Sequence, residues 1–416
     1  MDFSQERQIK YIDKIMHWCF MGLVFILPIA HTMSIRSVFM FLPMALWLYK
    51  MVLKKEILFV RNQMTLPLTV FAIVATLSVF TAINPKYTLR ELRGEMITDF
   101  LLFFLILNNI RDMKQVNNIV LSLLIGSFVQ GIYSSLHYFS MDWNLLNYDI
   151  KVGGLTGGYI SYSVFLISIL PFVAYKIVDS SGSGSKRFFF IGLIFINLFM
   201  LYLTHQRGAW IALIVQVFTF FLLLRRWILC TAVVGVIAVT LFLIPSGILY
   251  HGQKGINVAA DNALNTDNTI NSRIALWRFT LKEIGQHPFT GIGFGRHSFS
   301  MQYQQFRKTD LWHAHNTFLN LTIQLGFQGL LAFAFILYRL ARTYWIALKE
   351  AEGETYYFFL ASLISAVGFF VRNMFDDHYV DDNAQMFWVL TGLSVAMFIN
   401  IKKLTYSSIF SEGRFK

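Results

Sequence analysis

Apolar residues in this sequence occur in long runs, and short polar segments separate one run from the next. An α-helix needs about 20 apolar residues to cross a bilayer, whereas strands of a membrane β-barrel alternate apolar and polar residues over about ten. The pattern therefore predicts an all-α polytopic membrane protein. Twelve runs are candidate spans: 15–31, 35–53, 64–82, 96–110, 117–139, 157–178, 187–204, 208–224, 227–244, 316–340, 355–375 and 383–401.

The placement of Lys and Arg orients these spans. An even number of spans puts both termini on one side, and 21 of the 35 Lys and Arg residues fall on that side. Of the other 14, seven lie in one long loop, and the positive-inside rule does not count long loops. The short loops and termini therefore carry 21 Lys and Arg residues on the terminal side and seven on the opposite side. We therefore predict that both termini are cytoplasmic.

The spans divide the chain into four parts. Residues 1–244 hold spans one to nine, and residues 315–402 hold spans ten to twelve. Residues 245–314 form one long extracytoplasmic loop, which we expect to carry short amphipathic helices that cap the outer face, and 403–416 is a cytoplasmic tail. The first span follows a charged stretch as in a signal peptide, but Pro28–His31 is a poor cleavage site, so we expect an uncleaved span.

Composition agrees with a membrane protein and excludes a soluble domain. Hydrophobic residues make up 56% of the chain and charged residues 14%, against about 25% charged in soluble domains. The net charge of +12 is typical of nucleic-acid-binding proteins, but most of it lies in short cytoplasmic loops and serves orientation. Cys19 and Cys230 both lie in apolar runs, so we expect neither a disulfide nor a reactive thiol.

Titratable residues gather at the predicted outer face. The centres of the predicted spans are almost free of charged residues, which argues against the proton relays and ion pathways of many transporters. Nine of the ten histidines lie at or near the outer face. Histidine is the usual general base near neutral pH, so we expect the chemistry at this face.

The first candidate residue is Arg207, in the hairpin Thr204–Trp210 between two predicted spans. A guanidinium at the membrane boundary can bind a phosphate with two parallel hydrogen bonds. Gly208 permits a close approach of the backbone to a ligand. The alternative is a snorkelling arginine that anchors a helix end.

The second is Arg273, in the first turn of a helix expected from Asn271 or Ser272 to about Ile284. A cation in the first turn opposes the helix dipole, so Arg273 does not serve helix stability. Its position favours an anion bound near the helix N-terminus, with an exposed loop arginine as the alternative. One apolar face is expected from Ile274, Trp277, Leu281 and Ile284, packed on the membrane or the spans.

Two further motifs follow in the long loop. The glycine-rich segment His287–Gly295 is expected to form a structural turn, with backbone amides that bind a phosphate as the alternative. His313 and His315 lie just before the tenth span, with Asn316 next to them. Their two-residue spacing is a weak metal pattern and no zincin glutamate follows, so we predict no metal site.

An acidic segment joins the last two predicted spans. Asp376, Asp377, Asp381 and Asp382 lie within seven residues. They could bind a divalent cation, but we favour a solvated negative loop that pairs with Arg372. The role of this loop stays open at this stage.

Taken together, these motifs resemble the O-antigen ligase family and the superfamily that it shares with O-antigen polymerases and bacterial protein O-oligosaccharyltransferases. The matching segments are Arg207–Trp210, Ser272-Arg273 with Leu276-Trp277, His287–Gly295 and His315–Leu319. Gln206 departs from the serine often found before the family's hairpin arginine. The motifs cover about residues 200–330, and the topology covers the whole chain.

The resemblance implies a transferase of the bacterial inner membrane, a glycosyltransferase of the GT-C type that acts at the periplasmic face in lipopolysaccharide biosynthesis. The donor would be a glycan on undecaprenyl diphosphate and the acceptor a sugar of lipid A–core, with no metal ion or other cofactor. The family's catalytic histidine corresponds to His315 and its two diphosphate-binding arginines to Arg207 and Arg273. His313, Asn316, Gly208 and Trp277 are expected to support them.

Three functions compete on this basis. The first is an O-antigen ligase, and the second is a polymerase or protein O-oligosaccharyltransferase with the same donor chemistry. The third is a flippase for lipid-linked sugars, which the charge-poor spans and the Arg/Arg/His set on one face disfavour. Nothing in the sequence identifies the acceptor sugar or the glycan.

Overall fold

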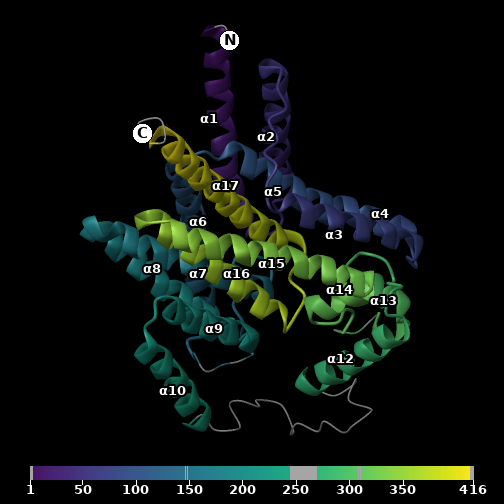
Figure 1. Cartoon of the computed structure of the whole chain (residues 1–416). Helices are drawn as coiled ribbons and strands as arrows, with labels where there is room; N and C mark the ends of the chain where they lie inside the picture. Colours follow the sequence, from purple (N-terminus) through teal and green to yellow (C-terminus); the bar gives the residue numbers. More distant parts are fainter. Residues whose placement is uncertain are drawn as a thin grey trace.

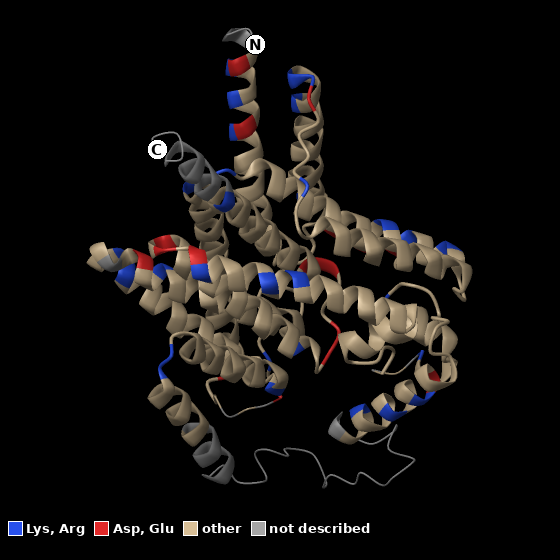
Figure 2. Ribbon diagram, in the orientation of Figure 1, with Lys and Arg blue, Asp and Glu red and all other residues tan. Residues whose placement is uncertain are grey.

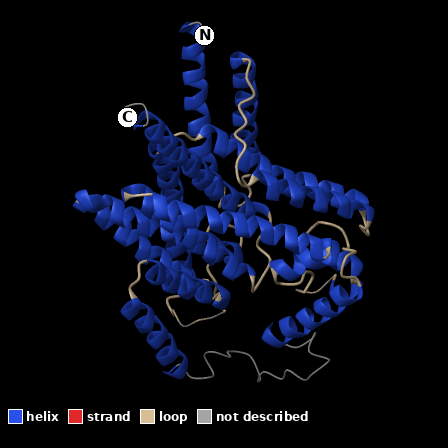
Figure 3. Ribbon diagram, in the orientation of Figure 1, coloured by secondary structure: helices blue, strands red, loops and turns tan. Residues whose placement is uncertain are grey.

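The computed structural model describes residues 3–145, 147, 149–243, 269–307, 309 and 311–412. Within these residues the chain forms helices joined by turns and loops, with no strand (Figure 3). The all-α class predicted from the apolar runs is therefore confirmed.

The helices before residue 244 follow the predicted apolar runs. Asn84 and Asp112 cap two of them, because each side chain accepts a hydrogen bond from a backbone N–H in the first turn. A π-helical stretch, Leu92–Ile97, joins two others. The α-helices are α1 (Phe3–Ile26), α2 (Met33–Lys54), α3 (Thr65–Leu77), α4 (Pro85–Glu91), α5 (Thr98–Asn109), α6 (Met113–Met141), α7 (Tyr159–Asp179), α8 (Gly184–Leu203), α9 (Arg207–Leu223) and α10 (Trp227–Leu243).

The helices after residue 268 build the remainder of the bundle and its cap. Two of them, α12 (Thr269–Gln286) and α13 (Ser298–Gln302), belong to the predicted long loop. The last helix continues beyond the predicted end of its span at residue 401. The other helices are α14 (Thr317–Leu325), α15 (Phe327–Glu350), α16 (Gly353–Asn373) and α17 (Asp381–Glu412).

Seven helices of the described residues are long and apolar enough to cross a membrane: α2, α6, α7, α8, α15, α16 and the Asp381–Lys402 part of α17. Two shorter apolar helices accompany them, Thr65–Phe80 and Arg207–Leu223. The chain is thus a multi-pass helical membrane protein, while the count of twelve spans stays a prediction. The 12-residue α5, for example, is too short to span a bilayer by itself. It rises only about 18 Å, whereas the hydrocarbon core is about 30 Å thick.

The tenth predicted span, 316–340, is wrong as a single helix. α14 ends at Leu325 and α15 begins at Phe327, because Gly326 between them has a φ of 75°, which a helix cannot contain. The short α14 also buries polar side chains, Asn320 and Gln324, which bind neighbouring loops. Hydropathy alone could not predict these contacts of Asn320 and Gln324.

Within the long loop, the predicted helix at 271–284 is present as α12, but two details are corrected. The helix begins at Thr269, so Asn271 and Ser272 lie inside it rather than capping it. Its buried face includes Leu276, Thr280 and Ile284, whereas Leu281 is exposed, because α12 packs on α14. The rest of the loop, 244–268, lies outside the described residues.

The bundle is organised around α16. This helix packs against α7 and α9, and α17 packs against α5. Figure 1 shows α1, α2 and α17 directed toward the end that carries both termini, with α12 at the opposite end. Figure 2 shows a mostly uncharged bundle, with Lys and Arg on the ends of α1 and α2 and along α12. The connection from α16 to α17, Met374–Val380, thereby reaches the beginnings of α9, α12 and α14.

Candidate active site

The residues singled out in the sequence meet at the connection between α16 and α17, which we call the α16–α17 turn (Met374–Val380). At its centre lies Asp376, only 3% exposed. Side chains from the start of α12 and from the segment before α14 contact this turn, and the backbone at Gly208, in the first turn of α9, packs against it. The turn therefore assembles the site.

His315 is held in place by the start of α14. The Asn316 side chain caps this helix, since its oxygen accepts hydrogen bonds from the backbone N–H groups of Phe318 and Leu319. The Asn316 amide also donates to the Met374 carbonyl at 3.0 Å, which ties the cap to the turn. His315 itself has a φ of 47°, an unusual conformation for a residue with a Cβ, of the kind found at functional sites.

The His315 ring contacts the buried carboxylate. Its Nδ1 lies 2.9 Å from Asp376 Oδ1. Burial raises the pKa of Asp376, but the hydrogen bond with His315 and the charge of Arg372 outweigh it and hold the pKa well below its usual value. The carboxylate is therefore ionised near neutral pH, so Nδ1 carries the proton and donates it in the hydrogen bond. This tautomer makes Nε2 the basic nitrogen of His315.

His313 lies beside His315 but has a different environment. Its Nδ1 accepts the backbone N–H of His315 at 3.1 Å, and the two ring centroids are 4.0 Å apart. Burial lowers the pKa of His313 well below its usual value, so the ring is neutral. The Trp277 indole N–H donates to the Ala314 carbonyl at 2.9 Å and fixes the backbone between the histidines. His313 and Trp277 thus support the position of His315.

Two arginines approach the other side of the turn. Arg273 Nη1 donates to the Phe375 carbonyl at 2.8 Å, and its Nη2 lies 3.8 Å from Asp376 Oδ2. Arg372, buried at the end of α16, also lies 3.8 Å from this oxygen. Arg273 is about one-third exposed, so it can still face a ligand.

Arg207 reaches the same turn through its neighbours in the hairpin. It is the first residue of α9, directly before Gly208. A Cβ at position 208 would lie 3.2 Å from Phe375 Cβ and 3.3 Å from an Arg372 Nη. On the other side of Arg207, Gln206 accepts a hydrogen bond from Arg372 at 3.2 Å. The hairpin that carries Arg207 therefore packs against the turn that binds Arg273.

The acidic segment divides into two parts, and the prediction of a solvated loop is wrong for the first. Asp376 and Asp377 are buried, whereas Asp381 and Asp382 are partly exposed. Asp377 accepts hydrogen bonds from Thr317, at 2.7 Å, and from Asn320, and so fastens α14 to the turn. Sequence hydrophilicity could not distinguish these pairs, because the burial of Asp376 and Asp377 depends on partners about 60 residues away.

The glycine-rich segment is a structural turn, as predicted. Gly293 and Gly295 have positive φ values of 99° and 139°. The backbone N–H groups of Ile292, Gly293, Phe294 and Gly295 donate to protein oxygens of α14 and of Ser78. These amides are therefore engaged within the protein, which argues against the alternative of a phosphate cradle.

His313, His315 and Asp376 also form a group that could hold a metal ion, with three ligand atoms within 4.8 Å of one another. The prediction of no metal rested on the histidine spacing, and folding adds a carboxylate that the spacing does not show. Arg273 and Arg372 lie 3.8 Å from the same carboxylate and oppose a divalent cation. We therefore interpret the group as a hydrogen-bonded histidine and carboxylate, and metal independence stays a prediction.

Three residues of the site were not predicted as catalytic or substrate-binding: Asp376, Arg372 and His378. The acidic segment was expected to pair with Arg372, and Asp376 lies 3.8 Å from it. His378 is buried, and its Nε2 lies 3.6 Å from Asp376 Oδ2. Burial lowers the pKa of His378 to about 3, so its ring is neutral. The sequence did contain a signal for these residues, because Arg372 lies near the end of an apolar run and Asp376, Asp377 and His378 follow it. Ionisable groups near a bilayer need partners.

Comparison with known proteins agrees with this assembly. Residues 192–334 match a family model described as O-antigen ligase. No curated protein matches the chain. The matched segment contains Arg273 and His315, which contact the α16–α17 turn, and Arg207, whose neighbour Gly208 packs against it. Residues 192–334 of this chain are therefore similar to the O-antigen ligase family.

Proposed function

We propose that this protein is an O-antigen ligase that transfers a glycan from undecaprenyl diphosphate to a sugar hydroxyl of lipid A–core. The observation that carries the proposal is the contact of His315 Nδ1 with the buried, ionised Asp376, beside Arg273 and the Arg207 hairpin. This places a candidate base next to candidate anion-binding groups. Such a pairing suits the transfer of a sugar from a diphosphate.

The base is His315. Its Nε2 accepts the proton of the acceptor hydroxyl as the oxygen attacks the anomeric carbon of the donor sugar. The imidazolium that forms is stabilised by Asp376, which lies 2.9 Å from Nδ1. Asp376 therefore acts as a positioning residue, since it sets the tautomer and orientation of His315 without touching the substrate.

The leaving group is the lipid diphosphate. The bond from the anomeric carbon to the diphosphate oxygen breaks as the new glycosidic bond forms, and negative charge grows on the phosphate. Arg207 and Arg273 stabilise that charge, so the reaction needs no metal ion and no strong acid. Attack opposite the leaving group inverts the configuration at the anomeric carbon. Because the bond energy travels with the donor, no ATP is required.

The proposed location is the bacterial inner membrane, with the active site on the periplasmic side. The positive-inside bias of Lys and Arg supports cytoplasmic termini, and the site lies at the other ends of the helices. Twelve crossings and a GT-C architecture belong to this proposal. The partners are the membrane lipid, the lipid-linked donor and the glycolipid acceptor, with no nucleic acid.

The alternatives share the donor chemistry. An O-antigen polymerase or a protein O-oligosaccharyltransferase would use the same base and arginines with another acceptor. Deletion of the gene followed by lipopolysaccharide electrophoresis separates the first of these from a ligase. Loss of all polysaccharide-bearing bands, single repeats included, supports the ligase, whereas retention of core plus one repeat indicates a polymerase. A flippase is disfavoured, because the centres of the predicted spans are almost free of charged residues and the Arg/Arg/His set lies on one face.

The direct test compares His315→Ala with His313→Ala in a transfer assay with purified protein. His315→Ala should abolish transfer and still bind the donor, because the arginines are unchanged. His313→Ala should retain substantial activity, since His313 supports the backbone and does not face the reaction. Activity of His315→Ala together with inactivity of His313→Ala would show that the base is misassigned.

Metal independence has its own test. Chelator treatment of the wild-type protein should leave transfer intact. Loss of transfer on chelation, with recovery on addition of magnesium or manganese, would instead assign a metal to His313, His315 and Asp376.

A further inference from the structure

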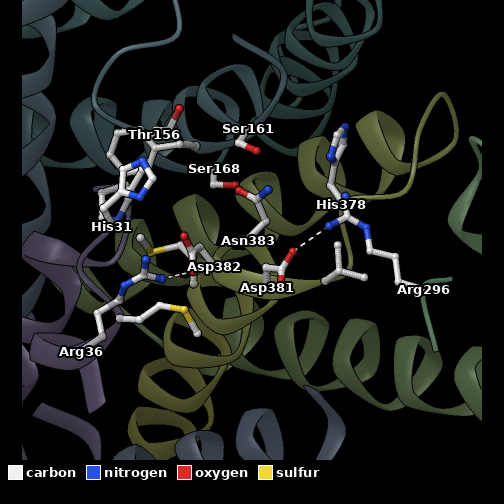
Figure 4. Close-up of a pocket in the computed structure, with 16 residues that line it drawn as sticks. His31, Arg36, Thr156, Ser161, Ser168, Arg296, His378, Asp381, Asp382 and Asn383 are labelled. Atoms are coloured by element: carbon white, nitrogen blue, oxygen red, sulfur yellow. Dashed lines mark hydrogen bonds and ion pairs between the residues drawn. The ribbon is translucent and has the colours of Figure 1, made fainter. Parts of the chain in front are cut away.

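A cavity of about 370 Å³ is lined by charged and polar side chains, which Figure 4 shows. One lining residue, His378, also contacts Asp376 of the proposed active site. The volume of the cavity falls in the range of about 300–1,000 Å³ that is typical of small-molecule sites. Its walls come from the α1–α2 connection, the start of α2, the first turns of α7, the loop before α13 and the start of α17. Ser161 and Ser168 on its wall lie seven residues apart in α7, so the cavity extends roughly 10 Å along that helix.

The charged groups of the cavity are matched in pairs. Arg36 binds Asp382 at one side, and Arg296 binds Asp381 at 2.8 Å on the other (Figure 4). Two arginines and two carboxylates give the cavity no net positive charge, which a phosphate would need for binding. Carboxylates accept hydrogen bonds and guanidinium groups donate them, so the pairs together suit a neutral ligand with many hydroxyl groups.

His378 forms part of the wall between the cavity and Asp376. Its side chain is buried, and its Nε2 lies 3.6 Å from Asp376 Oδ2. Ser161, Ser168 and Asn383 add neutral hydroxyl and amide groups between the two ion pairs (Figure 4).

The lining of the cavity favours the acceptor over the donor. His378 Nε2 lies 3.6 Å from Asp376 Oδ2, the oxygen that Arg273 also approaches, while Asp376 Oδ1 binds His315. The residues that line the cavity come from other elements than α9 and α12, which carry Arg207 and Arg273. Because its charges are balanced and neither proposed diphosphate ligand lines it, the cavity suits a sugar rather than the diphosphate.

We propose that this cavity is a saccharide subsite that binds a sugar unit of the acceptor, next to the unit whose hydroxyl reacts at His315. The inference rests on the proposed function for the identity of the acceptor. Asp381, Asp382 and Asn383 at the start of α17 recognise the sugar hydroxyls.

The first test measures occupancy without catalysis. Ser161→Cys, in a background with Cys19→Ala and Cys230→Ala, places one reactive thiol on the cavity wall. Lipid-free core oligosaccharide at about ten times its Kd should slow modification by a polar thiol reagent about tenfold. The matched control is Thr290→Cys, an exposed residue outside this cavity, whose modification rate should not change.

The second test measures acceptor recognition in the transfer assay. Asn383→Ala should raise the KM for the acceptor about 2- to 10-fold, the value of one lost hydrogen bond. The KM for the donor and the rate at saturating acceptor should stay unchanged. Thr290→Ala is the control and should behave as the wild type.

The outcomes separate this inference from the proposed function. Protection of Ser161→Cys by the donor glycan alone, or a raised donor KM in Asn383→Ala, overturns the acceptor assignment. Absence of protection by either saccharide overturns the subsite itself. Protection by core oligosaccharide in a protein that transfers no glycan would support the subsite and refute the ligase function.

Discussion

Replacement of Asp376 by asparagine tests the feature on which the proposed mechanism depends. Asparagine has nearly the same volume, so the buried turn keeps its packing, but the negative charge is lost. His315 Nδ1 would then face a neutral amide in place of a carboxylate 2.9 Å away. An amide can present either its oxygen or its NH₂ group, so the tautomer with Nε2 as the base is no longer enforced.

The expected magnitude follows from the contact. A hydrogen bond to a charged group contributes about 1.5–3 kcal/mol. The attraction between an imidazolium and a carboxylate about 4 Å apart is about 4 kcal/mol at an effective dielectric constant of about 20. Since about 1.4 kcal/mol is a factor of ten in rate, Asp376→Asn should lower kcat by about 10²- to 10³-fold. The KM for the donor should change little, because both proposed diphosphate ligands are retained.

The assay is glycan transfer by purified protein, with kcat and both KM values determined. Asp377→Asn is the matched control, because Asp377 is equally buried but binds Thr317 and Asn320 rather than His315. A kcat for Asp376→Asn within threefold of the wild type would refute the positioning role. An equal loss in both variants would show that burial of a carboxylate in the turn, and not its contact with His315, is what matters.

Three further predictions follow from the same geometry. Arg207→Lys and Arg273→Lys should each lower the transfer rate by at least about tenfold, because lysine keeps the charge but loses the bidentate fork; wild-type rates would refute the diphosphate role. Gly208→Ala should also lower transfer, since a Cβ there would lie 3.2 Å from the α16–α17 turn, an overpacking cost of about 1–3 kcal/mol; Gly192→Ala, with open space around its Cβ, is the control that should not. His378→Gln should reduce the loss of stability in acid, because the folded protein keeps His378 neutral down to a pKa of about 3, whereas in the unfolded chain this histidine binds a proton below about pH 6.5. Between pH 7 and pH 5 the wild type therefore loses about 2 kcal/mol of its free energy of unfolding at this residue. Thermal unfolding in detergent at both pH values tests this, and a pH dependence equal to that of the wild type would refute it.

The fold was predictable where hydropathy governs it. The long apolar runs of α6, α7 and α16 had to become helices, because the bilayer leaves no other way to pair their backbone groups. The break at Gly326 was not predictable from hydropathy, because an average over about 20 residues hides the few polar side chains of α14. Asn320 and Gln324 find their partners only in the folded protein.

The site was predictable where the type of a single residue and its position in the sequence indicate its role. Arg207, Arg273 and His315 each stood at a helix start on the predicted outer face, where charge is available to a substrate. Asp376 was not identified, because an aspartate among three others looks like a solvated loop. Its importance comes from burial against His315, a residue 61 positions earlier in the chain.

The same carboxylate explains how the site can hold positive charge before a donor binds. Asp376 Oδ2 lies 3.8 Å from both Arg273 and Arg372, while its Oδ1 binds His315. One buried negative charge thus offsets two guanidinium groups that would otherwise repel each other at the end of α16. In the proposed mechanism, a diphosphate bound at Arg273 would take over part of this compensation, and the carboxylate would be left to stabilise the imidazolium of His315. Asp376 would thereby link the proposed donor site to the proposed base.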